Sequence, residues 1–204
     1  MLFNSYFRLI QICKIQTSRN MIRLAHFQEA DFEQLIEWIH DEEILTNWAG
    51  NLFRFPLSNN SLKWYIKDTN ILNDSDAFVY KAIDTDGKTI GHISLGGISW
   101  KNRSARLTRV LIGNTTERGK GCCQGMIKAL LKIAFEELHL HRVSLGVYHN
   151  NTPATKCYEK AGFVTEGVQR DILWYKDDWC SMIEMSILET EWYKLHPQQL
   201  VLPK

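Results

Sequence analysis

The most regular pattern of hydrophobic positions lies over residues 126–138, where apolar side chains recur every three or four residues. The apolar set is Met126, Ile127, Leu130, Leu131, Ala134, Phe135 and Leu138, with Lys128, Lys132 and Glu136 on the opposite face. An amphipathic helix has this spacing, with one face in the core and one in water. The pattern therefore predicts a long helix here.

Three shorter segments also have helical features. Residues 32–39 keep the helical spacing of apolar side chains, and Asp31 is in position to cap them. A second helix is predicted over 62–67, after a loop-like stretch at 47–60. Residues 152–162 begin with Thr as an N-cap and Pro as the first helical residue, and they end on a Gly suited to a left-handed stop.

Alternation of apolar and polar residues, typical of β-strands, governs most of the remaining chain. Strands are predicted over residues 22–24, 78–83, 89–99, 106–112, 143–147, 168–175 and 180–187. The polar turns at 84–88 and 101–104 separate three consecutive strands, which favours antiparallel pairing. A third turn, 176–178, joins the last two strands. Strands and helices are interspersed without a repeat or a linker, so we expect one mixed α/β domain.

Composition narrows the class of protein. The chain has 204 residues, of which 45% are hydrophobic and 23% charged, so disorder, collagen and coiled coil are excluded for the whole chain. The formal net charge is +1, which does not favour a general nucleic-acid binder. No run of 18 apolar residues occurs, so no membrane span is expected.

The sequence also predicts the domain boundaries and the redox state of the cysteines. We expect one folded domain over residues 21–192, a leader or extension over 1–20 that lies outside it, and a C-terminal tail over 193–204. The cysteines are Cys13, Cys122, Cys123, Cys157 and Cys180. Their number is odd, no Cys-x-x-Cys occurs, and no secretory signal is evident. Reduced thiols in a cytoplasm are the simplest interpretation.

The stretch 117–123, Glu-Arg-Gly-Lys-Gly-Cys-Cys, lies between a predicted strand and the long helix. Its two glycines allow the backbone N–H groups to approach a ligand, and the helix start behind them favours an anion. With Arg118 and Lys120 beside them, the loop suits a pyrophosphate. A P-loop would need another spacing and a hydroxyl for magnesium, and a dinucleotide fingerprint would need a third glycine. A glycine turn with solvated basic residues remains a structural alternative.

Residues 151–163 read Asn-Thr-Pro-Ala-Thr-Lys-Cys-Tyr-Glu-Lys-Ala-Gly-Phe. Together with the glycine loop, this segment resembles the GCN5-related N-acetyltransferases (GNAT), which move an acetyl group from acetyl-CoA to an amine. Arg118, Gly121 and, less well, Cys123 match the family's loop pattern Gln/Arg-x-x-Gly-x-Gly/Ala. Residues 151–163 match its second pattern, Asn-x-x-Ala followed by Tyr-Glu-Lys-x-Gly-Phe.

The resemblance implies a single-domain GNAT-like α/β fold with a mixed, mostly antiparallel central sheet and helices on both faces. Residues 166–171, Trp179 and residues 184–185 are similar to the branch that contains ribosomal-protein N-terminal acetyltransferases. That branch also holds enzymes for small amines, so the implied acceptor is an amine of a small molecule or of a protein N-terminus. The resemblance allows a homodimer, because family members often pair through sheet edges. Neither nucleic acid nor membrane is an expected partner.

The resemblance also implies residue roles. The residues expected to bind acetyl-CoA are Leu111, Ile112, Gly113, Arg118, Gly119, Lys120, Gly121, Cys122, Cys123 and Asn151. The backbone of 111–113 would bond the pantetheine arm and the loop would hold the pyrophosphate, while Asn151 would contact the arm or cap a helix. Cys123 stands where the family prefers Gly or Ala, which predicts somewhat weaker CoA binding. Tyr158 is the expected general acid, because a tyrosine with a pKa near ~10 stays protonated at neutral pH.

Other roles stay open in the sequence. His92, His149 and Glu184 are candidates for the general base, but none is marked by its spacing, and no base is assigned. No metal-ligand spacing is present, and the cysteines are more typical of core residues than of nucleophiles. Five aromatic residues suggest an acceptor groove: Trp48, Phe53, Phe55, Trp174 and Trp179. The alternative function is a non-catalytic acyl-CoA-binding sensor or interaction domain with the same fold.

Overall fold

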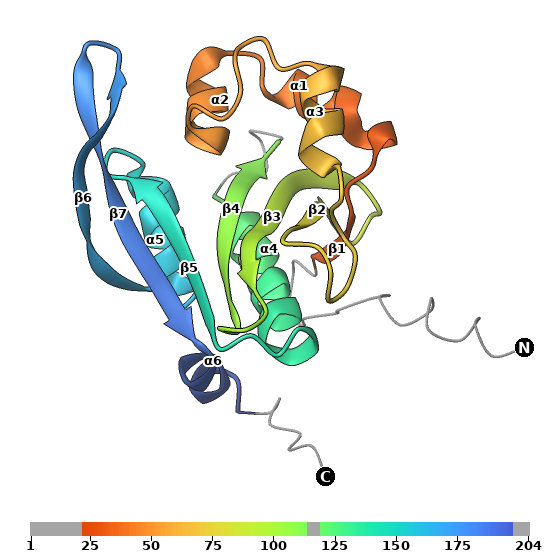
Figure 1. Ribbon diagram of the computed structural model, residues 1–204, viewed down its shortest axis with the longest axis vertical. Helices are drawn as coiled ribbons and strands as arrows, with labels where there is room; N and C mark the ends of the chain where they lie inside the picture. Colours follow the sequence, from red (N-terminus) through yellow and green to blue (C-terminus); the bar gives the residue numbers. More distant parts are fainter. Residues whose placement is uncertain (1–21, 114–118, 198–204) are drawn as a thin grey trace, which may run out of the picture.

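A computed structural model describes residues 22–113 and 119–197, in which seven strands form one mixed sheet (Figure 1). The strands are β1 (Arg23–His26), β2 (Phe78–Ile83), β3 (Thr89–Ser99), β4 (Ser104–Ile112), β5 (Arg142–Tyr148), β6 (Val164–Tyr175) and β7 (Asp178–Leu188). Their order across the sheet is β1-β2-β3-β4-β5-β7-β6. Neighbouring strands are antiparallel except β4 and β5, which run parallel. The predicted fold class is confirmed.

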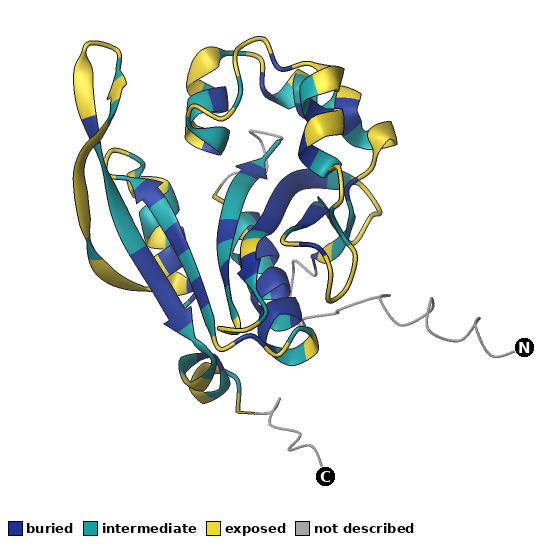
Figure 2. Ribbon diagram, in the orientation of Figure 1, coloured by how far each residue is buried: buried dark blue, intermediate teal, exposed yellow. Residues whose placement is uncertain are grey.

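Helices cover both faces of this sheet. They are α1 (Phe32–Trp38), α2 (Glu42–Ala49), α3 (Asn59–Ile66), α4 (Cys122–Lys132), α5 (Thr152–Lys160) and α6 (Glu189–Leu195). Alternation along β2 separates two cores, because Phe78 and Tyr80 join the cluster that contains α4, whereas Val79 joins the one formed with α1 to α3. Figure 2 shows the buried residues concentrated on the sheet and α4, with the tip of the β6–β7 hairpin exposed.

Two helices were not predicted. α2 occupies part of the stretch that we assigned to a loop. Asp41 caps it by accepting a hydrogen bond from the N–H of Ile44 at 2.7 Å, and Gly50 follows it with φ 59°. α6 follows β7 directly and buries Trp192 completely. It carries ordered structure to Leu195, past the predicted domain boundary at 192.

Two predicted caps were wrong. Asp31 makes no side-chain cap to α1; its carboxylate pairs instead with Lys81 of β2 at 2.6 Å, which ties this helix to the sheet. Thr152 is the first residue of α5, and the cap is Asn151, whose Oδ1 accepts from the helix backbone at 3.3 Å. Gly162 follows the helix with φ 101°, which is the expected left-handed stop.

The sheet splits between β4 and β5. These strands pair over three residues, Ser104–Arg106 with Arg142–Ser144, although each is longer. β4 is then irregular at Arg109, whose φ is 52°, and its register with β3 shifts there. A bulge of this kind bends a strand. Past the paired residues the two strands diverge and leave a wedge between them (Figure 1).

The predicted leader, residues 1–20, lies outside the described residues, as do Arg118 and residues 198–204 of the predicted tail. None of the described helices is long and apolar enough to cross a membrane.

Candidate active site

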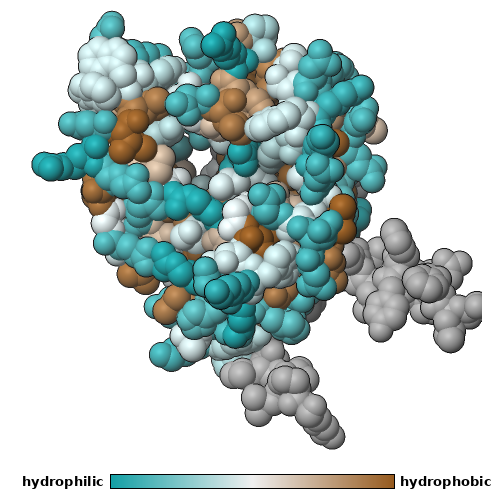
Figure 3. Space-filling model, in the orientation of Figure 1, coloured by the Kyte–Doolittle hydropathy of each residue, from teal (hydrophilic) through white to brown (hydrophobic). Residues whose placement is uncertain are grey.

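The wedge between β4 and β5 forms a cleft of about 1190 Å³. One side is lined by α2 and the β6–β7 hairpin, and the other by the starts of α4 and α5. Figure 3 shows the molecule hollowed at this place. Lys176 at the tip of the hairpin forms an ion pair with Glu43 of α2, which joins the two elements beside the cleft. The cleft therefore has two ends, one at the glycine loop and one under α2.

The glycine loop forms the first end. Gly119 and Gly121 line the cleft with φ of 79° and 86°, a conformation that favours glycine. Gly121 caps α4, and the first helical hydrogen bond runs from the N–H of Gly125 to its carbonyl at 2.9 Å. The N–H groups of residues 123–124 precede that bond and so remain available to an anion. Two lysines of α5, Lys156 and Lys160, also line the cleft, and the carbonyl of Lys160 accepts a hydrogen bond from Gln124 at the start of α4.

The edge of β4 forms one wall. The N–H of Gly113 donates to the carbonyl of Ile90 at 2.9 Å, so this group is already bonded. Because hydrogen bonds alternate along an antiparallel ladder, the N–H and C=O of Ile112 point to the other side, toward the cleft. Gly113 has a packing role, since a Cβ there would lie 2.0 Å from the ring of Trp38. The backbone of Ile112 is thus the part of 111–113 that is exposed to a ligand.

Tyr158 lies on α5 and lines the cleft close to the glycine loop. Burial raises the pKa of its hydroxyl above the ordinary value, and the neighbouring thiols of Cys123 and Cys157 act in the same direction. None of the hydrogen bonds in the described part of the chain involves this hydroxyl. Tyr158 is therefore neutral at physiological pH and able to donate its proton.

Cys123 and Cys157 also line the cleft, one from α4 and one from α5. The two thiols interact with each other, which raises the pKa of Cys123, with burial acting in the same direction, and lowers the pKa of Cys157. Both side chains are half-buried and pack against the main core, so the core interpretation holds for them in part. Cys122 and Cys180 are buried, as predicted for core cysteines.

None of the three candidate bases lines the cleft. His92 is buried beneath the bulge, and burial lowers its pKa to about 4. His149 is exposed and accepts the N–H of Ser181 at 3.2 Å. Glu184 pairs with Arg106 at 2.8 Å across β5. No general base emerges from these positions.

The bulge at Arg109 is held from below by two buried side chains. The Nε1–H of Trp48 and the Nδ1–H of His92 both donate to the Arg109 carbonyl, each at 3.0 Å. Because a carbonyl only accepts, we assign the imidazole hydrogen to Nδ1; the Nε1 of Trp48, 3.4 Å from the same nitrogen, then donates to the carbonyl rather than to the imidazole. These contacts join α2 and β3 to the bend in β4, and they fix the wall of the cleft. No spacing signal links these residues in the sequence.

Of the five residues of the predicted aromatic groove, Trp48 lines the cleft and the other four do not. Trp48 lies in α2 rather than in a loop, and it is buried and stacks on Phe53 with ring centroids 5.7 Å apart. Phe55 lies in an exposed loop away from the cleft. Trp174 and Trp179 contact each other on the hairpin, 5.2 Å apart, and do not line the cleft.

The structure brings most of the predicted site together. The predicted site residues that line the cleft are Leu111, Ile112, Gly119, Gly121, Cys123, Asn151 and Tyr158. The predicted residues that lie beside it without lining it are Gly113, Lys120 and Cys122. Arg118 lies outside the described residues. Within residues 22–113 and 119–197 no group of three His, Cys, Asp or Glu side chains has the arrangement of a metal site.

At one end of the cleft between β4 and β5, the glycine loop and the start of α4 present backbone N–H groups that can hold a phosphate, and we call this part the cradle. This arrangement suits an enzyme that transfers a group from a phosphate-bearing donor. Residues 22–164 match the family model described as an acetyltransferase (GNAT) domain, so the chain belongs to the GNAT family. It is an acetyl-CoA-dependent N-acetyltransferase, and the predicted family and function are confirmed.

Individual relatives agree with this assignment. The chain is 30% identical over 136 residues to the uncharacterized, SPbeta prophage-derived N-acetyltransferase YokL of Bacillus subtilis, covering 67% of this chain and 73% of the relative. It is 25% identical to an aminoglycoside N(6')-acetyltransferase of Klebsiella pneumoniae, covering 75% and 79%. Spermidine N-acetyltransferase of Vibrio cholerae, solved with CoA and spermine, has the same fold. Its TM-score is 0.73 at 23% identity, covering 84% of this chain and 97% of that one.

Proposed function

We propose that the cleft transfers the acetyl group directly to a primary amine of a small molecule or a protein N-terminus, with Tyr158 as the general acid. The observation that carries this proposal is the position of Tyr158. It lines the cleft near Cys123 at the start of α4, and its hydroxyl takes part in none of the described hydrogen bonds. Acetyl-CoA supplies an activated thioester. Gly119, Gly121 and the start of α4 would hold its pyrophosphate, and the Ile112 backbone would bond its pantetheine arm.

The residues of this chain then act on the transfer step. The amine attacks the thioester carbonyl, and the thiolate departs and takes its proton from the Tyr158 hydroxyl. A raised tyrosine pKa suits this role, because the hydroxyl stays protonated until the thiolate forms. We assign no base among the described side chains, so the ammonium is expected to lose its proton to water before attack. The rate should then rise with pH toward the pKa of the acceptor amine.

Other features of the described structure support proposals for the oligomeric state, the compartment and the acceptor. β6 is an edge strand with exposed Val164, Val168 and Ile172, so pairing of two copies along this edge would give a homodimer. Four cysteines of the described chain are free thiols, which supports a reducing cytoplasm. The acceptors of the relatives are amines, which supports an amine acceptor here.

Replacement of Tyr158 by Phe tests the proposal, with Tyr175→Phe on the hairpin as the matched control. We expect Tyr158→Phe to lower kcat at least about a hundredfold, because general acid catalysis contributes on that order. Stabilisation by acetyl-CoA should survive, and the control should keep its activity. Unchanged turnover of Tyr158→Phe across the pH range would show that Tyr158 is not the general acid.

A further inference from the structure

The carboxylates on the α2 side of the cleft are already engaged. Among the described residues, two carboxylates line the cleft, both at this end. Asp41 caps α2 and lies 3.6 Å from His40, and Glu43 is paired with Lys176. Glu184, behind the wall, accepts hydrogen bonds from Arg106 at 2.8 Å and Gln169 at 3.1 Å. The ammonium groups of a polyamine would have to compete with these partners, so this end favours a polyamine less than one with unpaired carboxylates would.

Arg109, unlike these carboxylates, has no charged partner in the described structure. It lines the cleft from the bulge in β4, and its guanidinium carbon lies 4.8 Å from the centre of the Tyr65 ring. Its Nη1 donates to the hydroxyl of Thr108 at 3.1 Å, while its Nε is buried without a partner. No carboxylate of the described chain forms an ion pair with it. A guanidinium held over an aromatic ring keeps its planar fork, which suits a carboxylate.

The place of Arg109 in the strand limits the size of the acceptor. It precedes Leu111 by two residues, or about 7 Å along a strand, so its side chain lies near the part of β4 that would face the acyl group. The bulge that turns Arg109 is fixed by Trp48 and His92. An anionic group bound to this guanidinium would bring an amine only a few bonds away to the thioester.

We propose that Arg109 binds a carboxylate of the acceptor, and that the acceptor is a small amine carrying its own carboxylate, as an amino acid does. This inference rests on the proposed function of the same cleft. It adds a substrate class and a binding residue to it. Arg109 would orient the amine, and Tyr158, near the glycine loop, would protonate the departing thiolate.

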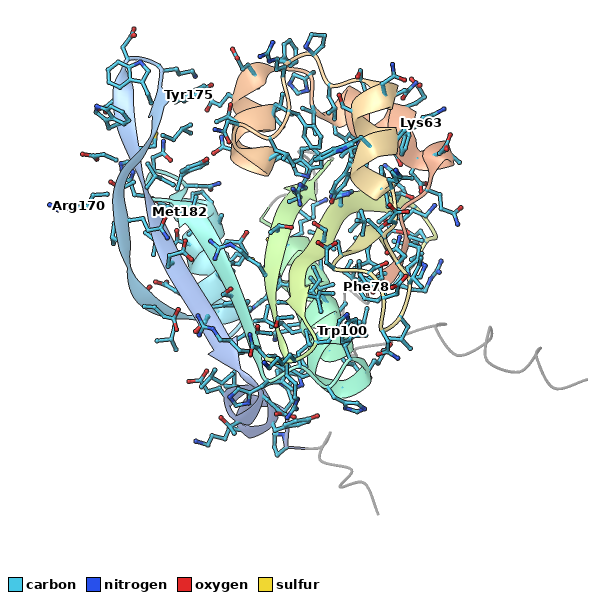
Figure 4. The ribbon with its side chains drawn as sticks, viewed as in Figure 1. Lys63, Phe78, Trp100, Arg170, Tyr175 and Met182 are labelled. Carbon is cyan, nitrogen blue, oxygen red and sulfur yellow. The ribbon has the colours of Figure 1, made fainter. Side chains whose placement is uncertain are left out.

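The test compares amino acids with their amides, which differ only in the carboxylate, and includes spermidine. Release of CoA thiol is measured with acetyl-CoA at saturation. We expect kcat/KM for the acids to exceed that for the amides and for spermidine at least tenfold. In Arg109→Met this preference should fall below about threefold through a rise in KM, while acetyl-CoA still raises Tm. Arg170 is exposed and points away from the cleft, on the far side of the hairpin from Met182 (Figure 4), so Arg170→Met is the control and should keep the preference.

Several results would overturn the inference. If the amides or spermidine are acetylated as well as the acids, the inference is wrong, although N-acetyltransfer itself still stands. The same holds if the preference for acids survives in Arg109→Met. Absence of transfer to any amine, despite stabilisation by acetyl-CoA, would instead remove the proposed function and this inference with it. If Arg109→Met does not fold, Arg109→Lys decides. It keeps the charge without the fork, and an unaltered preference at unaltered Tm would contradict a bidentate role.

Discussion

Acidification should destabilise the protein through His92 before its carboxylates titrate. The imidazole is buried, its Nδ1–H donates to the Arg109 carbonyl, and its Nε2 has no partner in the described structure. Protonation would therefore bury a charged N–H with nothing to accept it. Burial accordingly lowers the pKa of His92 from 6.5 to about 4.

The size and sign of the effect follow from that difference. Between pH 6.5 and 4 the unfolded chain binds a proton at His92 and the folded chain does not, so stability falls as the pH falls. Each pH unit of difference between the pKa of His92 in the unfolded chain and in the fold costs about 1.4 kcal/mol of unfolding free energy. With a folded pKa of about 4, the protein loses about 3 kcal/mol of stability by about pH 4. Burial also lowers the pKa of His26, which adds to the loss in the same direction.

Urea unfolding at intervals from pH 7 to pH 4.5 measures this dependence. His92→Phe keeps an aromatic ring among Phe27, Trp48 and Tyr65 but removes the titrating group. It should be less stable at pH 7, because it loses the bond to the Arg109 carbonyl, yet its stability should fall less steeply with acid. His149→Asn, at an exposed site, should behave as wild type. Equal slopes in His92→Phe and wild type would refute the assignment of this pH dependence to His92.

Three further predictions concern the loop and the surface. Gly121→Val should cost about 1–2 kcal/mol in unfolding experiments, because φ is 86° there, and should weaken acetyl-CoA binding in titration calorimetry; unchanged affinity would contradict the cradle. Cys123→Ala should bind acetyl-CoA within about threefold of wild type, since the Cys123 side chain packs against the core and interacts with Cys157 of α5; a tenfold gain would show that the cysteine does weaken binding. Arg142 and Ser186 lower the pKa of the exposed Glu166 to about 2, so its contribution is present above about pH 4.5 and lost toward pH 2. In Glu166→Gln that part of the acid dependence, about 1 kcal/mol after screening by solvent, should vanish from the unfolding curves.

The sequence predicted the parts of the fold that rest on local pattern. The long helix, the strands and the tight turn before β7 follow from periodicity and turn residues, and the glycine loop follows from glycines that stand at positive φ. α2 was missed although Asp41 and Gly50 delimit it, because its apolar face is only two turns long. α6 was missed for a similar reason, since it is short and follows a strand without a turn.

The end of the cleft under α2 could not be predicted in the same way. The bulge at Arg109 depends on Trp48 and His92, which are 61 and 17 residues distant in the chain and meet only through packing. The charge of this end depends on which carboxylates are already paired, and the partner of Glu43 is Lys176 on a distant hairpin. Cys123 and Cys157 come together only because α4 and α5 pack side by side.

The thermal unfolding midpoint with saturating acetyl-CoA, compared with ATP at the same concentration, tests most directly whether the cleft binds the acetyl donor. A ligand at a hundred times its Kd adds about 2.7 kcal/mol of stability, which raises Tm by several degrees in a domain of this size. The cradle at Gly121 and the wall at Ile112 predict such a rise with acetyl-CoA and none of that size with ATP. No rise with acetyl-CoA, or an equal rise with ATP, would contradict a donor site between β4 and β5.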